Sequence, residues 1–250
     1  MPVIFEHVNK HIKIILVNPS HPGNIGAAAR AMKTMGITKL SLVQPKEFPS
    51  VMATAMAAGA DDLLASAEVV TTVNEALKDA ELILGTSARI RAEPIPLLTP
   101  REAASLLSKR APTTKTAIMF GRESSGLTNE ELAKCHYHIH IPVNPDFSSL
   151  NLAAAVQVIC YELQLANTSK TPNEVTLATP LAPAATMQHF ILHLKKFLGE
   201  INFSRYHSID NMMIKLQHLF NRAQLTLPEI QILEGIISTA EHRIKETSEK

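Results

Sequence analysis

The chain has 250 residues, of which 46% are hydrophobic and 19% charged, and its formal net charge at pH 7 is +1. The apolar content is sufficient for a sizeable core, which excludes an intrinsically disordered chain, and the length fits one domain of ordinary size with a smaller appendage. The near-neutral charge is not the strongly basic balance typical of nucleic-acid binders, although basic residues outnumber acidic ones between Met1 and Lys46.

Strand-like apolar runs and helical patterns alternate along the chain as far as residue 166. The predicted strands cover residues 12–17, 39–43, 68–70, 81–84, 116–120 and 137–141. The predicted helices cover residues 25–35, 51–58, 73–78, 100–109, 129–133 and 150–165. Because the strands are almost continuously apolar and alternate with helices, they predict an α/β fold with a parallel sheet and helices on both faces.

Beyond residue 166 the pattern changes. Residues 167–183 are rich in Ser, Thr, Asn and Pro and indicate a linker. Residues 184–203, 209–223 and 228–247 carry apolar side chains at helical spacing and predict a small all-α bundle. We therefore expect one domain at 1–166, the linker at 167–183 and a helical domain at 184–250.

Three of the predicted strands run into loops of small and polar residues. The first is followed by NPSHPGN, in which Asn24 can cap the next helix, and the second, IMFGRESSGL, opens into a glycine-bounded loop. The third, IPVNPDFSSLN, brings Ser148, Ser149 and Asn151 to the start of a helix. Ligands of open parallel sheets bind beyond the carboxyl ends of the strands. The loops predict one binding site there, although a plain, well-capped core helix also explains the third loop.

The same three segments resemble the three motifs of the SPOUT class of RNA methyltransferases, in order and in spacing. They read Asn24-x-Gly26-x-x-x-Arg30, Phe120-Gly121-Arg122-Glu123-x-x-Gly126-Leu127, and Ile141-Pro142 through Ser148-Ser149-Leu150-Asn151-Leu152. The resemblance is strong over residues 10–166 and weak in the tail. It implies a trefoil knot at the C-terminal end of the domain, whereas rules of chain topology alone favour an unknotted doubly wound sheet.

Within that class the chain is most similar to bacterial enzymes that methylate the ribose 2′-oxygen of cytidine or uridine at nucleotide 32 of the tRNA anticodon loop. The resemblance implies S-adenosylmethionine as cofactor, tRNA as substrate and a homodimer. For the helical tail it suggests a contact with tRNA, and a role in packing and dimer support is an equally good interpretation.

Methyl transfer from S-adenosylmethionine is one in-line displacement, so the protein must hold a weakly nucleophilic hydroxyl in position and ease the loss of its proton. Arg30 is the preferred candidate for binding the phosphate and the 2′-oxygen, because its planar fork fits phosphate and it stays charged. The resemblance adds Asn24, Glu123, Ser149 and Asn151 to the catalytic pocket, without showing which of them handles the proton.

The cofactor-binding residues are likewise implied by the resemblance. Small side chains let backbone groups approach the adenine and ribose, while Ile141 and Leu150 provide apolar walls. The expected set is Thr86, Ser87, Ala88, Gly121, Ile141, Ser148, Ser149 and Leu150.

Residues with metal or redox chemistry are sparse. Cys135 and Cys160 form no Cys-x-x-Cys pair, so neither a disulfide nor a zinc site is indicated and both are interpreted as reduced and inert. His136, His138 and His140 alternate along one strand and share a face. A solvated strand face is the favoured interpretation, and no metal is expected. No apolar run reaches the roughly 20 residues of a membrane span and no export signal is evident, so we expect a cytoplasmic protein.

The expected homodimer would use the helices at 25–35 and 151–166. These helices carry small residues that permit close approach and apolar residues that supply contact area. They are Ala27, Ala28, Ala31, Ala153, Ala154 and Ala155, with Val156, Ile159 and Tyr161.

Other functions remain open at this level: a SPOUT enzyme acting on another tRNA or rRNA ribose, a non-catalytic RNA-binding module, or a nucleotide-binding oxidoreductase. Intact Arg30 and Ser149 argue against the non-catalytic module. The oxidoreductase is the weakest, because the segment after the first strand lacks the second and third glycines of a dinucleotide-binding turn.

Overall fold

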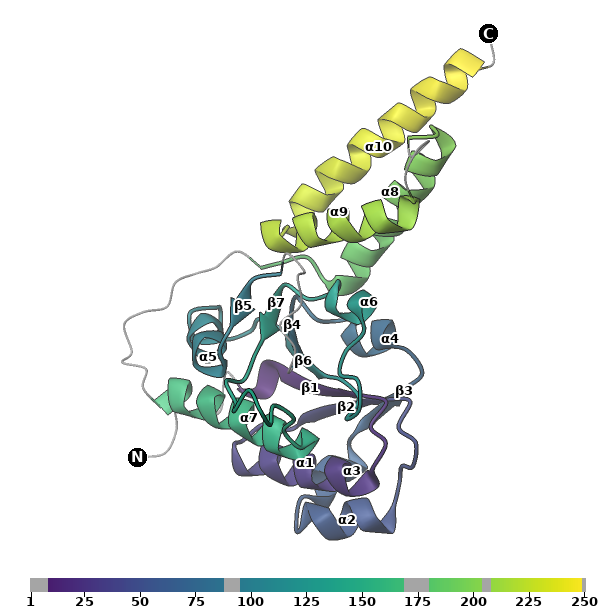
Figure 1. Cartoon of the computed structure of the whole chain (residues 1–250). Coiled ribbons are helices and arrows are strands. Elements are labelled where there is room, and N and C mark those ends of the chain that lie inside the picture. The colour runs from purple at the N-terminus through teal and green to yellow at the C-terminus, as the bar shows by residue number, and fades with distance from the viewer. Residues whose placement is uncertain (1–8, 88–94, 169–179, 204–207, 249–250) are drawn as a thin grey trace.

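The computed structural model describes residues 9–87, 95–168, 180–203 and 208–248. A seven-stranded parallel sheet in the order β3-β2-β1-β6-β4-β7-β5 forms its centre (Figure 1). The strands are β1 Ile12–Val17, β2 Lys39–Val43, β3 Glu68–Val70, β4 Leu82–Thr86, β5 Leu97–Leu98, β6 Thr116–Phe120 and β7 Tyr137–Ile139. The predicted parallel sheet is confirmed, and the two-residue β5 is an addition that no periodic pattern announced.

The helices follow the predicted alternation. They are α1 Pro22–Thr34, α2 Val51–Ala57, α3 Asp61–Ala65, α4 Val73–Leu77, α5 Pro100–Ser108, α6 Asn129–Leu132, α7 Leu152–Thr168, α8 Ala184–Glu200, α9 Ile209–Ala223 and α10 Leu227–Ser248, with a short 3-10 helix at Asn9–His11. The five-residue α3 was not predicted. Within the described residues, no helix has the length and apolarity needed to cross a bilayer.

Side chains of the central strands alternate between two apolar cores. In β1, Ile14 and Leu16 join the larger core with α1, α2, α3, α5 and α7, whereas Ile15 and Val17 join the second core with α4 and α6. All four side chains are almost completely buried. This is the burial expected of an interior parallel strand with helices on both faces, so that prediction is confirmed. The trefoil knot stays a prediction.

The first helix begins three residues earlier than predicted. Pro22 and Gly23 were assigned to a loop, but Pro22 occupies the first turn of α1 and His21 stands at the N-cap. Proline is tolerated there because the first turn needs no backbone N–H from it and its fixed φ suits a helix. Asn24 therefore lies inside the helix rather than capping it, which frees its side chain for another partner.

The interpretation of the histidines as a solvated face is wrong for His136 and His138, which are buried. His136 accepts a hydrogen bond at Nδ1 from the backbone N–H of Ile83, and burial lowers its pKa to about 4. The reason is tertiary: β5 covers one edge of β7, and Asn221 of α9 lies at the start of the strand. Among the described residues, no group of three or more His, Cys, Asp or Glu side chains is arranged to hold a metal ion.

The three tail helices form the predicted bundle and dock against the amino ends of β4 and β7 (Figure 1). The N–H of Ala184 donates to the carbonyl of Ala80, just before β4, at 2.7 Å. Nδ2 of Asn221 donates to the carbonyls of Ala133 and Cys135, just before β7, at 2.8 and 3.3 Å. The domain division stays a prediction: α7 already takes up residues 167 and 168, and residues 169–179 of the predicted linker lie outside the described part of the chain.

The bundle contains a histidine held between two carboxylates. Nδ1 of His193 on α8 contacts Glu234, and Nε2 of His193 lies 3.1 Å from Oε1 of Glu241. Both glutamates lie on α10. The hydrogen bond to Glu234, which outweighs desolvation, and the bond to Glu241 raise the pKa of His193. A raised pKa in the folded state means that the stabilisation is fully present below the unfolded pKa of about 6.5 and is lost as pH rises through the folded value.

We therefore expect His193→Gln to lower the melting temperature more at pH 6 than at pH 9. Glutamine keeps hydrogen-bonding capacity but cannot carry the charge. Thermal unfolding of the two proteins at both pH values measures this difference, and an equal loss at pH 6 and pH 9 would mean that the charge contributes nothing.

Candidate functional site

A cavity of about 310 Å³ lies at the carboxyl ends of β4, β6 and β7, against the start of α7. This volume is at the lower end of the range of about 300 to 1,000 Å³ typical of small-molecule sites. Serine and glycine residues contribute hydroxyls and accessible backbone, and aliphatic residues contribute apolar surface. The lining residues are Thr86, Ser87, Phe120, Gly121, Arg122, Glu123, Ser124, Ser125, Gly126, Ile139, Ile141, Val143, Ser148, Ser149, Leu150, Leu152 and Ala155.

The loop at 121–127 forms one wall and is folded tightly on itself. The N–H of Arg122 donates to the carbonyl of Gly126 at 3.2 Å, and the N–H of Gly126 donates back to the carbonyl of Arg122 at 2.8 Å. A Cβ on Gly121 would lie 2.0 Å from the carbonyl carbon of Gly126 and 2.2 Å from the backbone nitrogen of Leu127. Gly126 has φ +70°, in the left-handed region. The close contacts therefore require glycine at position 121, and the left-handed conformation favours it at position 126.

The carboxylate of Glu123 connects this loop to the start of α1. Its Oε1 accepts a hydrogen bond from Nδ2 of Asn24 at 3.1 Å, and its Oε2 accepts from the N–H and the hydroxyl of Ser20 at 3.1 and 3.0 Å. Partial burial alone would raise the pKa of Glu123, but the hydrogen bonds from Asn24 and Ser20 outweigh it and the pKa is lowered. Glu123 is thus an anion at neutral pH beside a helix N-terminus, where the helix dipole favours negative charge.

Asn24 extends the connection to the third loop. Its Oδ1 accepts a hydrogen bond from Nδ2 of Asn151 at 2.9 Å. The Oδ1 of Asn151 accepts in turn from the N–H groups of Ala153 and Ala154 at 2.9 and 3.4 Å, so Asn151 caps α7. One chain of hydrogen bonds, Glu123–Asn24–Asn151, therefore joins the three motif segments.

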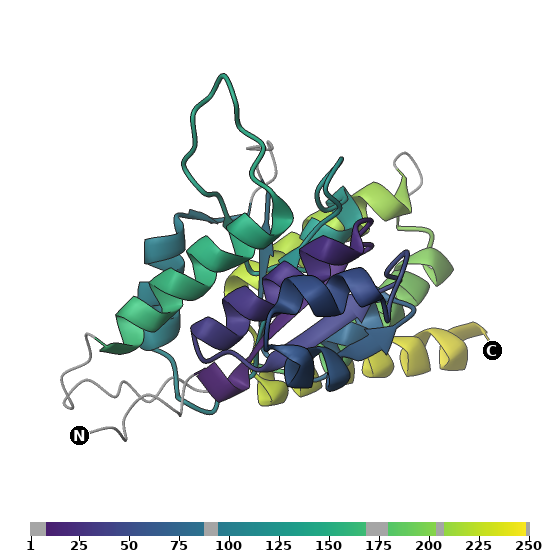
Figure 2. The ribbon, with the colours of Figure 1, turned by 90° about the horizontal axis from the view of Figure 1, so that it is seen from below.

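The segment between β7 and α7 projects from the body of the molecule (Figure 2). Ser148, Ser149 and Leu150 line the cavity from this segment and are exposed, and Phe147 beside them is 78% exposed. The sequence pattern placed these residues at the start of the helix, but α7 begins only at Leu152. The polar groups therefore belong to a loop that the α7 cap anchors at one end.

The structure brings most of the predicted site residues together. Those that line the cavity are Thr86, Ser87, Gly121, Glu123, Ile141, Ser148, Ser149 and Leu150. Asn24 and Asn151 are joined to Glu123 by hydrogen bonds. Ala88 lies outside the described residues. The hydroxyl of Thr86 donates to the carbonyl of Met119 at 3.0 Å, so this donor is already engaged within the protein.

Arg30 does not line the cavity. It is exposed on α1, six residues beyond Asn24, which corresponds to about 9 Å along the helix axis. Within the described residues its guanidinium has no hydrogen-bonding or ion-pairing partner. Two other basic residues of the N-terminal region are engaged elsewhere, since Lys13 pairs with Glu68 at 3.2 Å and Lys33 with Asp62 at 2.7 Å.

Sequence reasoning missed Ser20 as a site residue. The sequence pointed to Ser20 only through its position two residues before Pro22. Backbone N–H groups just before a helix have no partner within that helix and can bind an anion. It also gave no role to the side chain of Arg122. The buried cysteines fit the prediction of inert thiols, because desolvation raises the pKa of Cys160 to about 12 and that of Cys135 still further.

Comparisons with known proteins agree with this geometry. The model of the SpoU rRNA Methylase family matches residues 11–161, and the model of the tRNA methyltransferase TrmJ C-terminal domain matches residues 185–249. A Citrobacter koseri protein named tRNA (cytidine/uridine-2′-O-)-methyltransferase TrmJ is 45% identical, over 94% of this chain and 98% of its own. A Pseudomonas aeruginosa protein named tRNA (cytidine/uridine/adenosine-2′-O-)-methyltransferase TrmJ is 45% identical, over 91% and 92%.

The fold also matches a solved structure along nearly the whole chain. The crystal structure of TrmJ from Z. mobilis ZM4 superimposes with a TM-score of 0.81 at 35% identity, covering 92% of this chain and 98% of that one. The resemblance that the three motifs indicated is thereby confirmed and extends through the helical tail. The chain belongs to the SpoU methylase family and, within it, to the TrmJ tRNA methyltransferases.

Proposed function

We propose that the protein transfers the methyl group of S-adenosylmethionine to a ribose 2′-oxygen of tRNA in the cytoplasm. The observation that carries the proposal is the cavity at the carboxyl ends of β4, β6 and β7, with the Glu123–Asn24–Asn151 hydrogen bonds beside it. Relatives along nearly the whole chain are named for this reaction on cytidine and uridine. The proposed target is nucleotide 32 of the anticodon loop, with another tRNA or rRNA ribose as the alternative.

The residues of the cavity fit this cofactor. Ile141 and Leu150 offer apolar surface to an adenine ring, and Ser87, Gly121 and Ser148 offer hydroxyl and backbone groups to a ribose and an amino acid. Ala88 joins the proposed set on the strength of the resemblance. When bound, S-adenosylmethionine supplies a sulfonium methyl group that transfers in a single displacement. The protein then has to supply position and charge control.

The proposed catalytic residues divide these tasks. Glu123 is an anion held by Ser20 and Asn24, and its proposed role is to hold these donors and the loop in position. Ser149 lines the cavity and contacts the ribose hydroxyl, while Asn24 and Asn151 fix the relative positions of the loops. Arg30 binds the phosphate and the 2′-oxygen. Its exposed position outside the cavity suits the phosphate contact, because the RNA backbone approaches from solvent.

Methyl transfer onto unmodified tRNA transcripts tests the proposal. With S-adenosylmethionine present, mass-spectrometric mapping should find one added methyl group, on the ribose of nucleotide 32. Methylation at another ribose would support the alternative target. No methylation of any tRNA, together with no binding of S-adenosylhomocysteine in a calorimeter, would leave a non-catalytic RNA-binding module as the better interpretation.

The helical tail docks at the amino ends of the strands, whereas the cavity lies at their carboxyl ends. The tail of a chain therefore does not line that chain's own cavity. We propose the division into a methyltransferase domain at 1–166, a linker at 167–183 and a helical domain at 184–250. A contact between the helical domain and the methylated nucleotide held by the same chain is therefore not expected.

We also propose a homodimer that includes the exposed face of α7. Five of the residues expected at the interface, Ala28, Ala31, Ala153, Val156 and Ile159, are already buried within the chain, where α1 and α7 pack on each other. The apolar area left for a partner includes Tyr161, which is 48% exposed, and Leu165, which is 36% exposed. Twofold dimers are also the commonest oligomers.

Light scattering at micromolar concentration should accordingly give twice the mass of one chain. Tyr161→Glu places a charge on the proposed face and should shift the protein toward the monomer. Leu192→Glu, which changes a 58% exposed residue of α8, is the matched control and should leave the dimer intact. A monomeric wild-type protein, or equal effects of the two substitutions, would contradict the proposed interface.

A further inference from the structure

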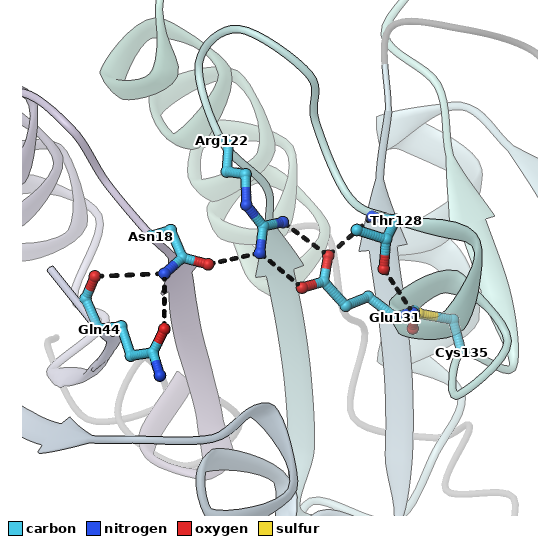
Figure 3. Close-up of polar contacts among 6 residues, drawn as sticks. All are labelled: Asn18, Gln44, Arg122, Thr128, Glu131 and Cys135. Carbon is cyan, nitrogen blue, oxygen red and sulfur yellow. Dashed lines mark hydrogen bonds and ion pairs between the residues drawn. The ribbon is translucent and has the colours of Figure 1, made fainter.

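Arg122 and Glu123 are neighbours in the 121–127 loop, but their side chains reach different partners. Glu123 contacts Ser20 and Asn24, as described above. Nη1 of Arg122 donates to Oε2 of Glu131 at 3.0 Å, and its Nη2 donates to Oε1 of the same carboxylate at 3.1 Å and to Oδ1 of Asn18 (Figure 3). One planar guanidinium thus holds two acceptors on two separate elements, a geometry that the single ammonium of lysine cannot reproduce.

Each partner of Arg122 is itself fixed. Glu131 has a side chain only 10% exposed, and its Oε2 also accepts from the N–H of Thr128 at 2.7 Å in the capping box of α6. Asn18 follows β1 with φ 47°, and its Nδ2 donates to the carbonyl and Oε1 of Gln44, at the end of β2, at 3.4 and 3.1 Å. The side chains Glu131–Arg122–Asn18–Gln44 therefore run from α6 across the carboxyl ends of β6, β1 and β2 (Figure 3).

The position of Asn18 gives this chain of contacts a second consequence. Asn18 lies two residues before Ser20, whose N–H and hydroxyl hold Glu123. Two successive residues of the 121–127 loop therefore contact the segment before α1. Arg122 contacts Asn18, and Glu123 contacts Ser20. If the guanidinium of Arg122 lost its contact with Asn18, the neighbouring contact between Glu123 and Ser20 would weaken as well.

We propose that Arg122 is a positioning residue, which holds the 121–127 loop so that Glu123 meets Ser20 and Asn24 and the cavity wall keeps its shape. Arg122 acts through Glu123 and the loop backbone rather than on the reacting atoms. The inference rests on the proposed function insofar as the cavity binds S-adenosylmethionine. The placement of the loop itself does not depend on that ligand.

The test uses a double substitution, Arg122→Met with Glu131→Gln, in the full-length protein. Removing Arg122 alone would leave the buried carboxylate of Glu131 unpaired and could unfold the protein. Glutamine at position 131 removes the charge but still accepts the bond that caps α6. The control is Arg101→Met with Glu162→Gln, because Arg101 also makes a two-pronged pair, with Glu162 at 3.3 Å between α5 and α7, away from the loop. The Arg101 side chain is 80% exposed and that of Arg122 30%, so the control matches the geometry of the pair and not its burial.

Amide hydrogen exchange without any ligand is the first measurement. The Arg122 double variant should fold and its amides at 121–127 should exchange faster, whereas the control should leave that loop unchanged. If the double variant does not fold, Arg122→Lys, which keeps the charge opposite Glu131 but loses the fork, should show the same local increase at smaller amplitude. Unchanged exchange at 121–127 in a folded variant would overturn the inference.

Calorimetric titration with S-adenosylhomocysteine and methylation rates are the second measurement. Affinity and rate should each fall about tenfold in the Arg122 double variant, as expected when a loop shifts by a fraction of an ångström. In a Glu123→Gln background the same substitutions should lower the rate less than about twofold, because the effects of substitutions at coupled residues do not add. Fully additive losses would overturn the inference. A wild-type protein that binds no S-adenosylhomocysteine would instead contradict the proposed function, and the exchange measurement would still decide the role of Arg122.

Discussion

Arg30→Ala is expected to lower the rate of tRNA methylation about a hundredfold while the affinity for S-adenosylmethionine and the melting temperature stay near wild type. Losing a contact to charge that develops in the transition state commonly costs about 3 kcal/mol, which corresponds to about a hundredfold in rate. The structure separates the two effects, because Arg30 is exposed and lies outside the cavity. Initial methylation rates beside calorimetry of cofactor binding measure them independently.

Arg30→Lys is the matched control. Lysine keeps the positive charge and loses the planar fork, so only part of the activity should return. An Arg30→Ala protein with an unchanged methylation rate would remove Arg30 from the catalytic residues. Parallel losses of cofactor affinity and melting temperature would assign it a structural role instead.

Gly121→Ala is expected to weaken cofactor binding strongly, and its effect should begin in the backbone. The added Cβ would lie 2.0 Å from the carbonyl carbon of Gly126 and 2.4 Å from its oxygen, and neither atom belongs to a flexible side chain. The 121–127 loop must therefore move. A misplacement of about 1 Å in an active site can lower the rate about a hundredfold, and we expect a comparable loss of cofactor affinity. Titration with S-adenosylhomocysteine should show a dissociation constant raised by at least about that factor.

Gly235→Ala provides the control for the same change of side chain. Gly235 lies within α10 and a Cβ there would meet nothing within 4 Å. Alanine is the better helix former by about 1 kcal/mol, so this variant should be slightly more stable and bind the cofactor as wild type does. Tight cofactor binding by the Gly121→Ala protein would contradict this expectation, because it would show that the 121–127 loop accommodates a Cβ at position 121 without losing the binding site.

The motif segments meet at one edge of the sheet, for a reason that concerns topology. In a parallel sheet the carboxyl ends of the strands share one edge, so the motif loops after β1, β6 and β7 converge whatever their separation in sequence. Gly121 and Ile141 belong to motif segments and were therefore expected in one place, whereas Thr86 was expected only from the resemblance. All three line the cavity. The pattern could not separate residues that face the cavity from those beside it, and Arg30 and Asn151 fall in the second group.

Two errors in the predicted elements have different causes, one a contact between segments distant in the sequence and one a local property of proline. His136 and His138 alternate with apolar residues as a half-solvated strand does, yet β5 and α9 bury them. Pro22 and Gly23 indicate a loop by composition, but a proline in the first turn is compatible with a helix. A window of local sequence contains neither the covering strand nor the docked tail.

The sequence by itself determined the parallel sheet, the positions of its main strands and helices, the helical tail and the family, because these depend on local apolar periodicity and on motif spacing. Only the tertiary structure decided which polar groups meet. The carboxylate of Glu123 reaches Ser20 and Asn24, about a hundred residues earlier in the chain, and Arg122 reaches Asn18 and Glu131 from the adjacent position. Hydrogen bonds form over about 3 Å between side chains with fixed directions, so they depend on the packed backbone and not on the order of residues along it.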